Sequence, residues 1–192
     1  MILPIFLYGT DELRETAKEA DLSDKEGITT LVNDMYETMR HADGCGIAAP
    51  QVGRLLRILI VDGSDLSDVY DYLKDFKRIM INPVLVEESE ETETFQEGCL
   101  SLPNLHLDVV RPAKIKVRYY DENFELKEEA FDRFACRMVQ HEMDHLDGKV
   151  FVDRVPQIRR KLVQGRLSGI ARGCVRTSYK VKFNSKKDRK HQ

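Results

Sequence analysis

The chain has 192 residues, a formal net charge of -3 at pH 7 and 42% hydrophobic residues. This length fits one domain, with enough apolar side chains for a core that needs no disulfides. The mild acidic balance argues against nucleic-acid binding over the whole surface, and no apolar run approaches the roughly 18 residues of a membrane span.

The first part of the chain predicts two helices. We expect a short helix over residues 11–20 and a longer one that Ser23 or Asp24 caps. The longer helix has apolar residues at helical spacing: Ile28, Leu31, Val32, Met35 and Met39. It ends before the glycine-bounded segment 43–53, which is too short for a helix and by itself indicates a turn.

Strands are expected in the middle of the chain. Residues 57–61 and 79–87 are rich in apolar residues, and Asn82-Pro83 makes the second strand an edge or bulged one. The polar stretch 62–77 is expected to be an exposed excursion with a helical turn. Residues 114–130 predict a hairpin of two strands around a polar turn.

The C-terminal part predicts a helix over 131–146, a basic helix over 156–172 and a closing strand over 178–183. Antiparallel strands with segregated helices indicate the α+β class, with the strands packed around the central helix 131–146. We expect one catalytic domain over 1–155. Residues 156–192 would form a helix-and-strand extension that ends in a basic tail: Lys186, Lys187, Arg189 and Lys190.

The basic tail is expected to be a solvated terminus, with contact to the ribosome or to RNA as the alternative. The start of the chain, residues 1–4, lacks the basic region of a secretory signal, so we expect a cytoplasmic protein. In a reducing compartment cysteines are free thiols or metal ligands. We expect Cys136 and Cys174 to be plain thiols.

The helix over 131–146 contains the strongest chemical signal. His141 and His145 are four residues apart, so both imidazoles project from one helix face and can reach one metal ion. Glu142 can approach a metal-bound water, whose pKa the metal lowers toward about 7. A carboxylate there can act as general acid and base. The motif predicts a metal-dependent hydrolase.

A third protein ligand is needed to complete such a site. No histidine follows His145 until His191, so the better candidate lies upstream, at Cys99 in the glycine-bearing segment 97–103. Taken alone, Cys99 is as readily interpreted as a buried free thiol. The two histidines alone also occur by chance on surface helices.

Three segments together resemble the peptide deformylases over about residues 1–155. These segments are GCGIAAPQ at 44–51, EGCLS at 97–101 and QHEMDHL at 140–146. The resemblance implies removal of the formyl group from the N-terminal formyl-methionine of newly made polypeptides, with release of formate. It also implies one divalent metal, most often Fe(2+), which Zn(2+), Ni(2+) or Co(2+) can replace. A thiolate and two imidazoles are compatible with all four.

The resemblance also implies roles for individual residues. The metal ligands would be Cys99, His141 and His145, and Glu142 would be the general acid and base. The side chain of Gln51 and the backbone N–H of Leu100 would stabilise the developing oxyanion.

The substrate peptide would lie as an added strand along the first motif. Cys45 and Gly46 would line its groove, with Glu97 and Gly98 opposite. The methionine pocket would use the helix face of Phe134, Met138 and His141.

We also have expectations for two further residues of the helix, and the chain departs from the family pattern at two places. Arg137 would be a solvated helix residue with a packed stem, or else a gate of the pocket. Asp144 would either orient an imidazole or face solvent. Cys45 stands where most members of the family have an aliphatic residue. Many members also carry an arginine shortly after the second motif, but the segment 104–107, which contains His106, has none.

The sequence leaves two rival functions open. A zincin-type peptidase would need a third ligand after His145 and would cut internal peptide bonds. A catalytically degenerate relative would bind a metal or peptide without turnover. The presence of Cys99, Gln51 and Glu142 in the three motifs argues against both.

Overall fold

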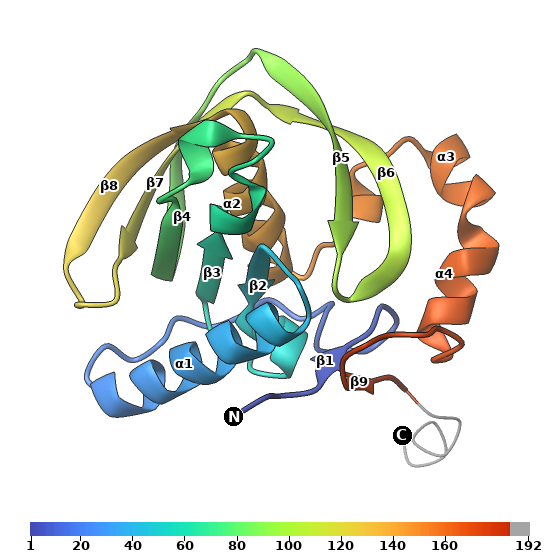
Figure 1. The fold of residues 1–192 in the computed structure, drawn as a ribbon, viewed down its shortest axis with the longest axis horizontal. Helices are drawn as coiled ribbons and strands as arrows, with labels where there is room; N and C mark the ends of the chain where they lie inside the picture. Colours follow the sequence, from blue (N-terminus) through green and yellow to red (C-terminus); the bar gives the residue numbers. More distant parts are fainter. Residues whose placement is uncertain (185–192) are drawn as a thin grey trace.

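The computed structural model describes residues 1–184, which form an α+β fold around a central helix, α2 (Arg133–Leu146). Figure 1 shows a five-stranded sheet on one side of α2 and the β5–β6 ribbon on the other. The predicted fold class is confirmed. The basic tail lies outside the described residues.

The main sheet has the strand order β2-β3-β4-β7-β8, and every neighbouring pair is antiparallel. Its strands are β2 (Gly46–Ala48), β3 (Ile58–Asp62), β4 (Lys77–Glu88), β7 (Lys114–Tyr120) and β8 (Leu126–Asp132). Because β2 pairs only with β3 in this sheet, its other side is an edge. The strands predicted from residues 57–61, 79–87 and 114–130 are confirmed.

The β5 (Thr92–Cys99) and β6 (Leu102–Pro112) strands form an antiparallel ribbon joined by a two-residue turn. The sequence analysis did not predict these strands. Hydrophobic alternation is weak in β5, where the buried position nearest the turn is a glutamate, Glu97. The ribbon places Cys99 at the end of a strand.

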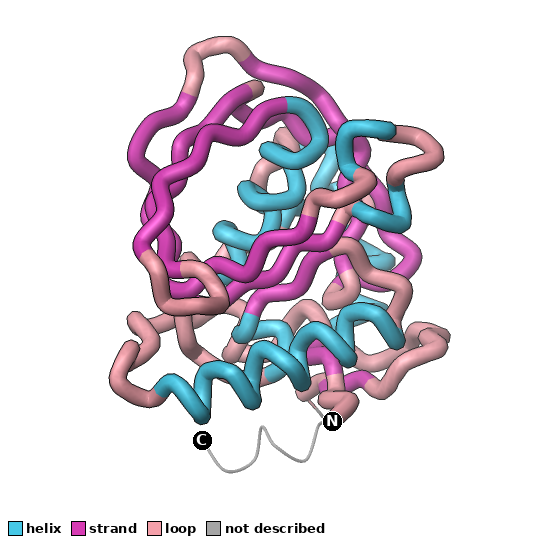
Figure 2. The backbone as a smooth tube through the Cα atoms, turned by 60° about the vertical axis from the view of Figure 1, so that its left-hand side comes forward, coloured by secondary structure: helices cyan, strands magenta, loops and turns pink. Residues whose placement is uncertain are grey.

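Helix α1 (Lys25–His41) packs one apolar face on the main sheet, through Ile28, Val32, Met35 and Met39. Of the two capping residues that the sequence offered, Ser23 and Asp24, it is Asp24 that caps the helix, by accepting a hydrogen bond of 3.0 Å from the Gly27 backbone N–H. Figure 2 shows that α2, in contrast, runs through the ring of strands. Strands therefore surround α2 and bury most of its residues.

The predicted helix over 11–20 is wrong. The segment turns and then extends, because its backbone pairs with distant segments: Lys18 N–H donates to Leu55, and its carbonyl accepts from Arg57. The polar stretch 62–77 forms two short 3-10 turns, η2 (Ser64–Leu66) and η3 (Asp71–Leu73). It is not simply exposed, since Leu73 is buried and Tyr70 stacks on Phe134 at 4.9 Å.

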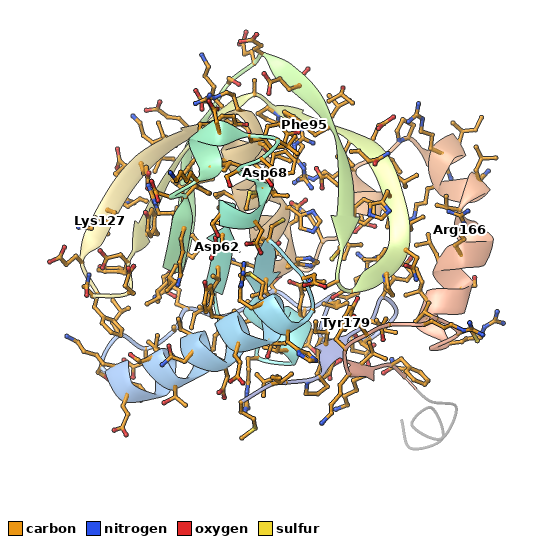
Figure 3. All side chains as sticks on the ribbon, in the orientation of Figure 1. Asp62, Asp68, Phe95, Lys127, Arg166 and Tyr179 are labelled. Atoms are coloured by element: carbon orange, nitrogen blue, oxygen red, sulfur yellow. The ribbon has the colours of Figure 1, made fainter. Side chains whose placement is uncertain are left out.

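The C-terminal part forms two helices, α3 (Gln157–Leu162) and α4 (Gln164–Ala171), where the sequence predicted one. Strand β9 (Val181–Lys182) then pairs in parallel with β1 (Ile5–Phe6). Figure 3 shows charged side chains such as Arg166 on the outside of the molecule. Within residues 1–184, no helix combines the length and hydropathy needed to cross a bilayer.

Asn82 holds the bulge of β4, as the Asn-Pro pair predicted. The strand's register shifts between Ile81 and Val84, and Asn82 has a φ of 53°. Its side chain accepts from the Ala20 N–H at 2.7 Å and donates to the Ala20 carbonyl at 2.9 Å. The bulge thereby ties β4 to the N-terminal segment.

We expect Asn82→Ala to lower the free energy of unfolding by about 2 kcal/mol or more, since it loses both bonds and strains the positive φ. Urea denaturation measures this loss. Asn82→Gly is the matched control: it also loses both bonds but accepts a positive φ, so it should unfold at higher urea than the alanine variant. Equal stability of wild type and Asn82→Ala would contradict this role.

Candidate metal centre

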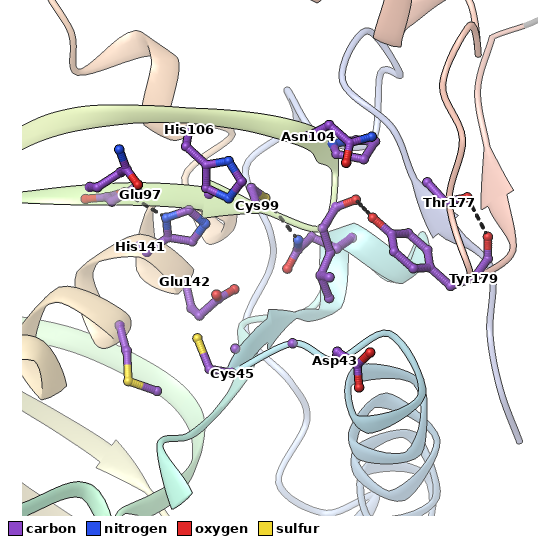
Figure 4. Close-up of a pocket in the computed structure, with 18 of the residues that line it drawn as sticks. Asp43, Cys45, Glu97, Cys99, Asn104, His106, His141, Glu142, Thr177 and Tyr179 are labelled. Carbon is purple, nitrogen blue, oxygen red and sulfur yellow. Dashed lines mark hydrogen bonds and ion pairs between the residues drawn. The ribbon is translucent and has the colours of Figure 1, made fainter. Parts of the chain in front are cut away.

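Three predicted ligands converge where β5 ends beside α2. Figure 4 shows two of them, Cys99 and His141. One ligand atom each from Cys99, His141 and His145 lies within 4.8 Å of the others. The Cys99 Sγ is 3.3 Å from the His145 Nε2, and the ring centroids of His141 and His145 are 5.3 Å apart. One sulfur and two nitrogens this close can hold a single divalent ion and leave a coordination position open.

Glu97 orients the first imidazole. Its carboxylate lies 2.8 Å from the His141 Nδ1, so a ring protonated at Nδ1 donates to Glu97 and keeps Nε2 for a metal. Arg111 and Arg137 also donate to Glu97, at 2.7 and 2.8 Å. Glu97 borders the pocket as predicted, but its carboxylate is buried and points at His141. Burial raises its pKa, yet His141 and Arg111 lower it well below the usual range.

Electrostatics favour the metal-binding form of the cysteine. Burial alone would raise the pKa of Cys99, but the neighbouring His145 and His141 lower it to about 5. Burial likewise opposes protonation of His141, while Cys99 and Glu97 raise its pKa well above the usual value. The positive charge of the neighbouring imidazoles thus favours the thiolate of Cys99, which is the form that binds a metal.

Glu142 follows the first histidine and points toward β2. It is buried, and burial is the main reason that its pKa rises to about 7. Its Oε2 atom has no hydrogen-bond partner among residues 1–184. A Cβ at Gly46 would lie 2.4 Å from the Glu142 Oε1, so only glycine allows this approach. A buried carboxylate titrating near neutrality suits proton transfer.

The two predicted oxyanion donors border the same site. The Gln51 Oε1 accepts from the Ala48 N–H at 2.8 Å, which turns its Nε2 toward Cys99 Sγ at 3.4 Å and Ser101 Oγ at 3.2 Å. Leu100 follows Cys99 in the turn between β5 and β6. A side-chain amide and a backbone N–H thus flank the thiolate.

Expectations about two residues of helix α2 need correction. Arg137 is only 3% exposed and donates to Glu97 and to the Val109 carbonyl, so the expectation of a solvated residue is wrong. Arg137 lies in the pocket wall, and the alternative role as a gate stays a prediction. Asp144 is also buried, where it accepts from Arg111 at 2.6 Å and from Arg154, so it neither faces solvent nor orients an imidazole. No motif in the sequence singles out Arg111. Only the alternation of buried and exposed residues in β6 places it on the buried face of that strand.

A pocket opens beside these residues. The residues predicted to bind substrate lie in its wall: Cys45, Gly46, Glu97, Gly98, Phe134 and Met138. The wall also includes His106 on β6 and a C-terminal segment, residues 176–179, to which the sequence analysis assigned no site. The pocket thus contains two of the proposed ligands, Cys99 and His141, and is lined by β2, the β5–β6 ribbon, α2 and the C-terminal segment.

These features fit a metal-dependent hydrolase: three side chains that can hold one ion, a buried glutamate with one oxygen unpaired among residues 1–184, and an adjoining pocket. A family model described as polypeptide deformylase matches residues 2–161, and the chain belongs to this family.

Relatives with this name match nearly the whole chain. A peptide deformylase of Chlorobium phaeobacteroides is 43% identical over 184 residues, which cover 96% of this chain and 97% of that protein. One of Christiangramia forsetii is 38% identical over 98% of this chain and all of its own length. A crystal structure of a peptide deformylase from Legionella pneumophila has a TM-score of 0.77 at 34% identity, covering 88% of this chain and 94% of that chain.

We expect Glu97→Gln to weaken metal binding about 10- to 100-fold, the usual scale for losing an outer hydrogen-bond partner of a ligand. It should also lower the free energy of unfolding by about 3–5 kcal/mol, because Arg137 stays buried without its counter-charge and Arg111 keeps only Asp144. Titration with Zn(2+) against a chromophoric chelator measures affinity, and urea denaturation measures stability. Glu88→Gln, at an exposed position on β4, is the control. Wild-type affinity in Glu97→Gln would refute the orienting role.

Proposed function

We propose that this deformylase removes the formyl group from N-terminal formyl-methionine by means of one divalent ion held by Cys99, His141 and His145. The observation that carries the proposal is the convergence of these three ligand atoms within 4.8 Å beside the buried Glu142. The chain is an enzyme of the family that the comparisons define.

A bound ion would supply a Lewis acid that polarises the formyl carbonyl and lowers the pKa of a water molecule. We propose Fe(2+), with Zn(2+), Ni(2+) or Co(2+) as substitutes. In support, a borderline set of one thiolate and two imidazoles suits all four.

The protein groups handle the proton and the developing charge. Glu142 accepts a proton from the attacking water and delivers it to the leaving nitrogen, while water oxygen bonds to the formyl carbon and the carbon–nitrogen bond breaks. Formate and a free α-amine result. Gln51 Nε2 and the Leu100 N–H donate hydrogen bonds to the carbonyl oxygen as it becomes negative.

The substrate peptide is proposed to extend β2 as an added strand. The outer edge of β2 borders the pocket, where backbone groups of Cys45 and Gly46 can pair with an extended chain. Gly98 forms the opposite wall. Phe134 and Met138 supply an apolar face for the methionine side chain, and the Glu97 carboxylate is already engaged with His141.

The position of the candidate third ligand favours this function over a zincin-type peptidase, and turnover in the assay below separates it from a degenerate relative. The candidate third ligand comes from Cys99, upstream of the helix, and not from a residue after His145 as a zincin-type peptidase requires. Because the substrate is a newly made chain, we place the enzyme in the cytoplasm. Ribosome contact through the basic tail remains a proposal.

We expect the protein to release formate from formyl-Met-Ala-Ser and to leave acetyl-Met-Ala-Ser and internal peptide bonds intact. In Glu142→Ala, kcat should fall by about 10²–10⁴, the scale of general acid-base catalysis, while the metal content stays near wild type. Formate release and metal analysis measure these effects. Glu90→Ala, at an exposed position between β4 and β5, is the control. Full activity of Glu142→Ala would remove Glu142 from the mechanism.

Cys99→Ser should lose most of the bound metal and most of the activity, because a serine hydroxyl stays protonated at neutral pH and is a poor ligand. Metal content per chain after anaerobic purification measures the effect. The matched control is Cys174→Ser, which changes an exposed thiol and should retain the metal. An unchanged metal content in Cys99→Ser would exclude Cys99 as a ligand.

A further inference from the structure

The segment 176–182 between α4 and the described end of the chain reaches the active-site pocket. Residues 176–179 form part of the pocket wall, although the family match ends at residue 161. Figure 4 shows Tyr179 beside the turn that follows Cys99. The C-terminal segment therefore touches the catalytic region from a part of the chain that the three family motifs do not include.

Tyr179 makes a direct hydrogen bond to the residue proposed as an oxyanion donor. Its hydroxyl donates to the Leu100 carbonyl at 2.7 Å. Leu100 lies in the two-residue turn between β5 and β6 and follows Cys99 directly. A rotation of this turn would change both the direction of the Leu100 N–H and its distance from the metal ligand.

Other contacts confine the same turn. A Cβ at Gly44 would lie 2.7 Å from the Leu100 Cδ1, so the Leu100 side chain packs directly on the first motif. The Ser101 carbonyl accepts from the Tyr8 N–H at 2.9 Å. These contacts hold the Leu100 side chain and the next residue. The hydroxyl of Tyr179 holds the backbone carbonyl of Leu100 itself.

Tyr179 has a fixed support. The carbonyl groups of Lys180 and Lys182 accept from the Ile5 and Leu7 N–H groups at 2.9 and 2.8 Å, where β9 pairs with β1. The Thr177 hydroxyl donates to the Tyr179 carbonyl at 2.8 Å. Backbone hydrogen bonds directly after Tyr179 thus restrict where its ring can move.

The same β1–β9 pair also supports the second donor. The Phe6 ring of β1 packs on Gly53, where a Cβ would lie 2.5 Å from the Phe6 Cζ. Gly53 ends the 3-10 turn η1 (Ala49–Val52), which contains Gln51. One pair of short strands, formed by the two ends of the described chain, therefore lies behind both proposed oxyanion donors.

We propose that Tyr179 is a positioning residue for deformylation: its hydroxyl fixes the Leu100 turn so that the Leu100 N–H points at the oxyanion. This inference rests on the proposed function. It makes the C-terminal segment part of the active site. Since Tyr179 acts through Leu100, its loss affects the transition state, where charge develops on oxygen, more than substrate binding.

Tyr179→Phe tests the proposal, because it removes only the hydroxyl and keeps the ring in the pocket wall. For formyl-Met-Ala-Ser we expect kcat to fall about tenfold, less than the 10²–10³ typical of deleting a donor outright. KM should change less than about twofold, since the variant keeps the contacts that bind the substrate and the transition state equally well. Metal content should equal that of wild type.

Tyr119→Phe is the matched control for the loss of a partly buried tyrosine hydrogen bond. Tyr119 donates to Glu129 at 2.8 Å on the main sheet, so its variant should lose stability but keep kcat. Urea denaturation places both variants on one stability scale. An equal fall of kcat in both variants would make the effect of Tyr179 a structural one and overturn the proposal.

Two further outcomes would also overturn it: an unchanged kcat in Tyr179→Phe, or a rise in KM at constant kcat, which would assign Tyr179 to substrate binding. Failure of wild type to release formate in the same assay is a separate result. It would refute the proposed function and not only the role of Tyr179.

Discussion

The structure depends on one buried carboxylate, that of Glu97. It accepts hydrogen bonds from the His141 imidazole, from Arg111 and from Arg137, which connects β5, β6 and α2 at one point. Each of these charges would cost several kcal/mol to bury alone, so the cluster is stable only with its members together. Arg111 also donates to Asp144, which lies one turn after His141 on α2, and so extends the cluster. The orientation of a candidate metal ligand is therefore tied to the packing of the β5–β6 ribbon on the helix.

Helix α2 serves the core and the site at the same time. Met138, Val139 and Leu146 belong to the main hydrophobic cluster, while His141, Glu142 and His145 face the candidate centre. Burial of the helix among strands raises the pKa of Glu142, and the same burial excludes water that would screen the Cys99 thiolate from the histidines. Removing solvent thus supplies both the stability of the fold and the electrostatics of the site.

The two ends of the described chain meet behind the active site. β1 and β9 pair beneath the turns that contain Gln51 and Leu100, and Tyr179 extends from this pair to the Leu100 carbonyl. Oxyanion donors act well only when they are already aimed before the charge develops. The β1–β9 pair, which lies far from the three motifs in the sequence, can hold both proposed donors in place before the charge develops.

Local features follow from the sequence: a cap of α1 at Ser23 or Asp24, an edge or a bulge at Asn82-Pro83, and the placement of His141 and His145 on one helix face. Each follows from short-range periodicity or turn chemistry. The three motifs of the sequence also indicated Cys99, Gln51 and Leu100 through resemblance. Only the tertiary structure decided the partners of Glu97, the burial of Arg137 and the contact of Tyr179 with Leu100. Those contacts join residues 14 to 79 positions apart, so they depend on strand register and helix packing, which no local pattern encodes.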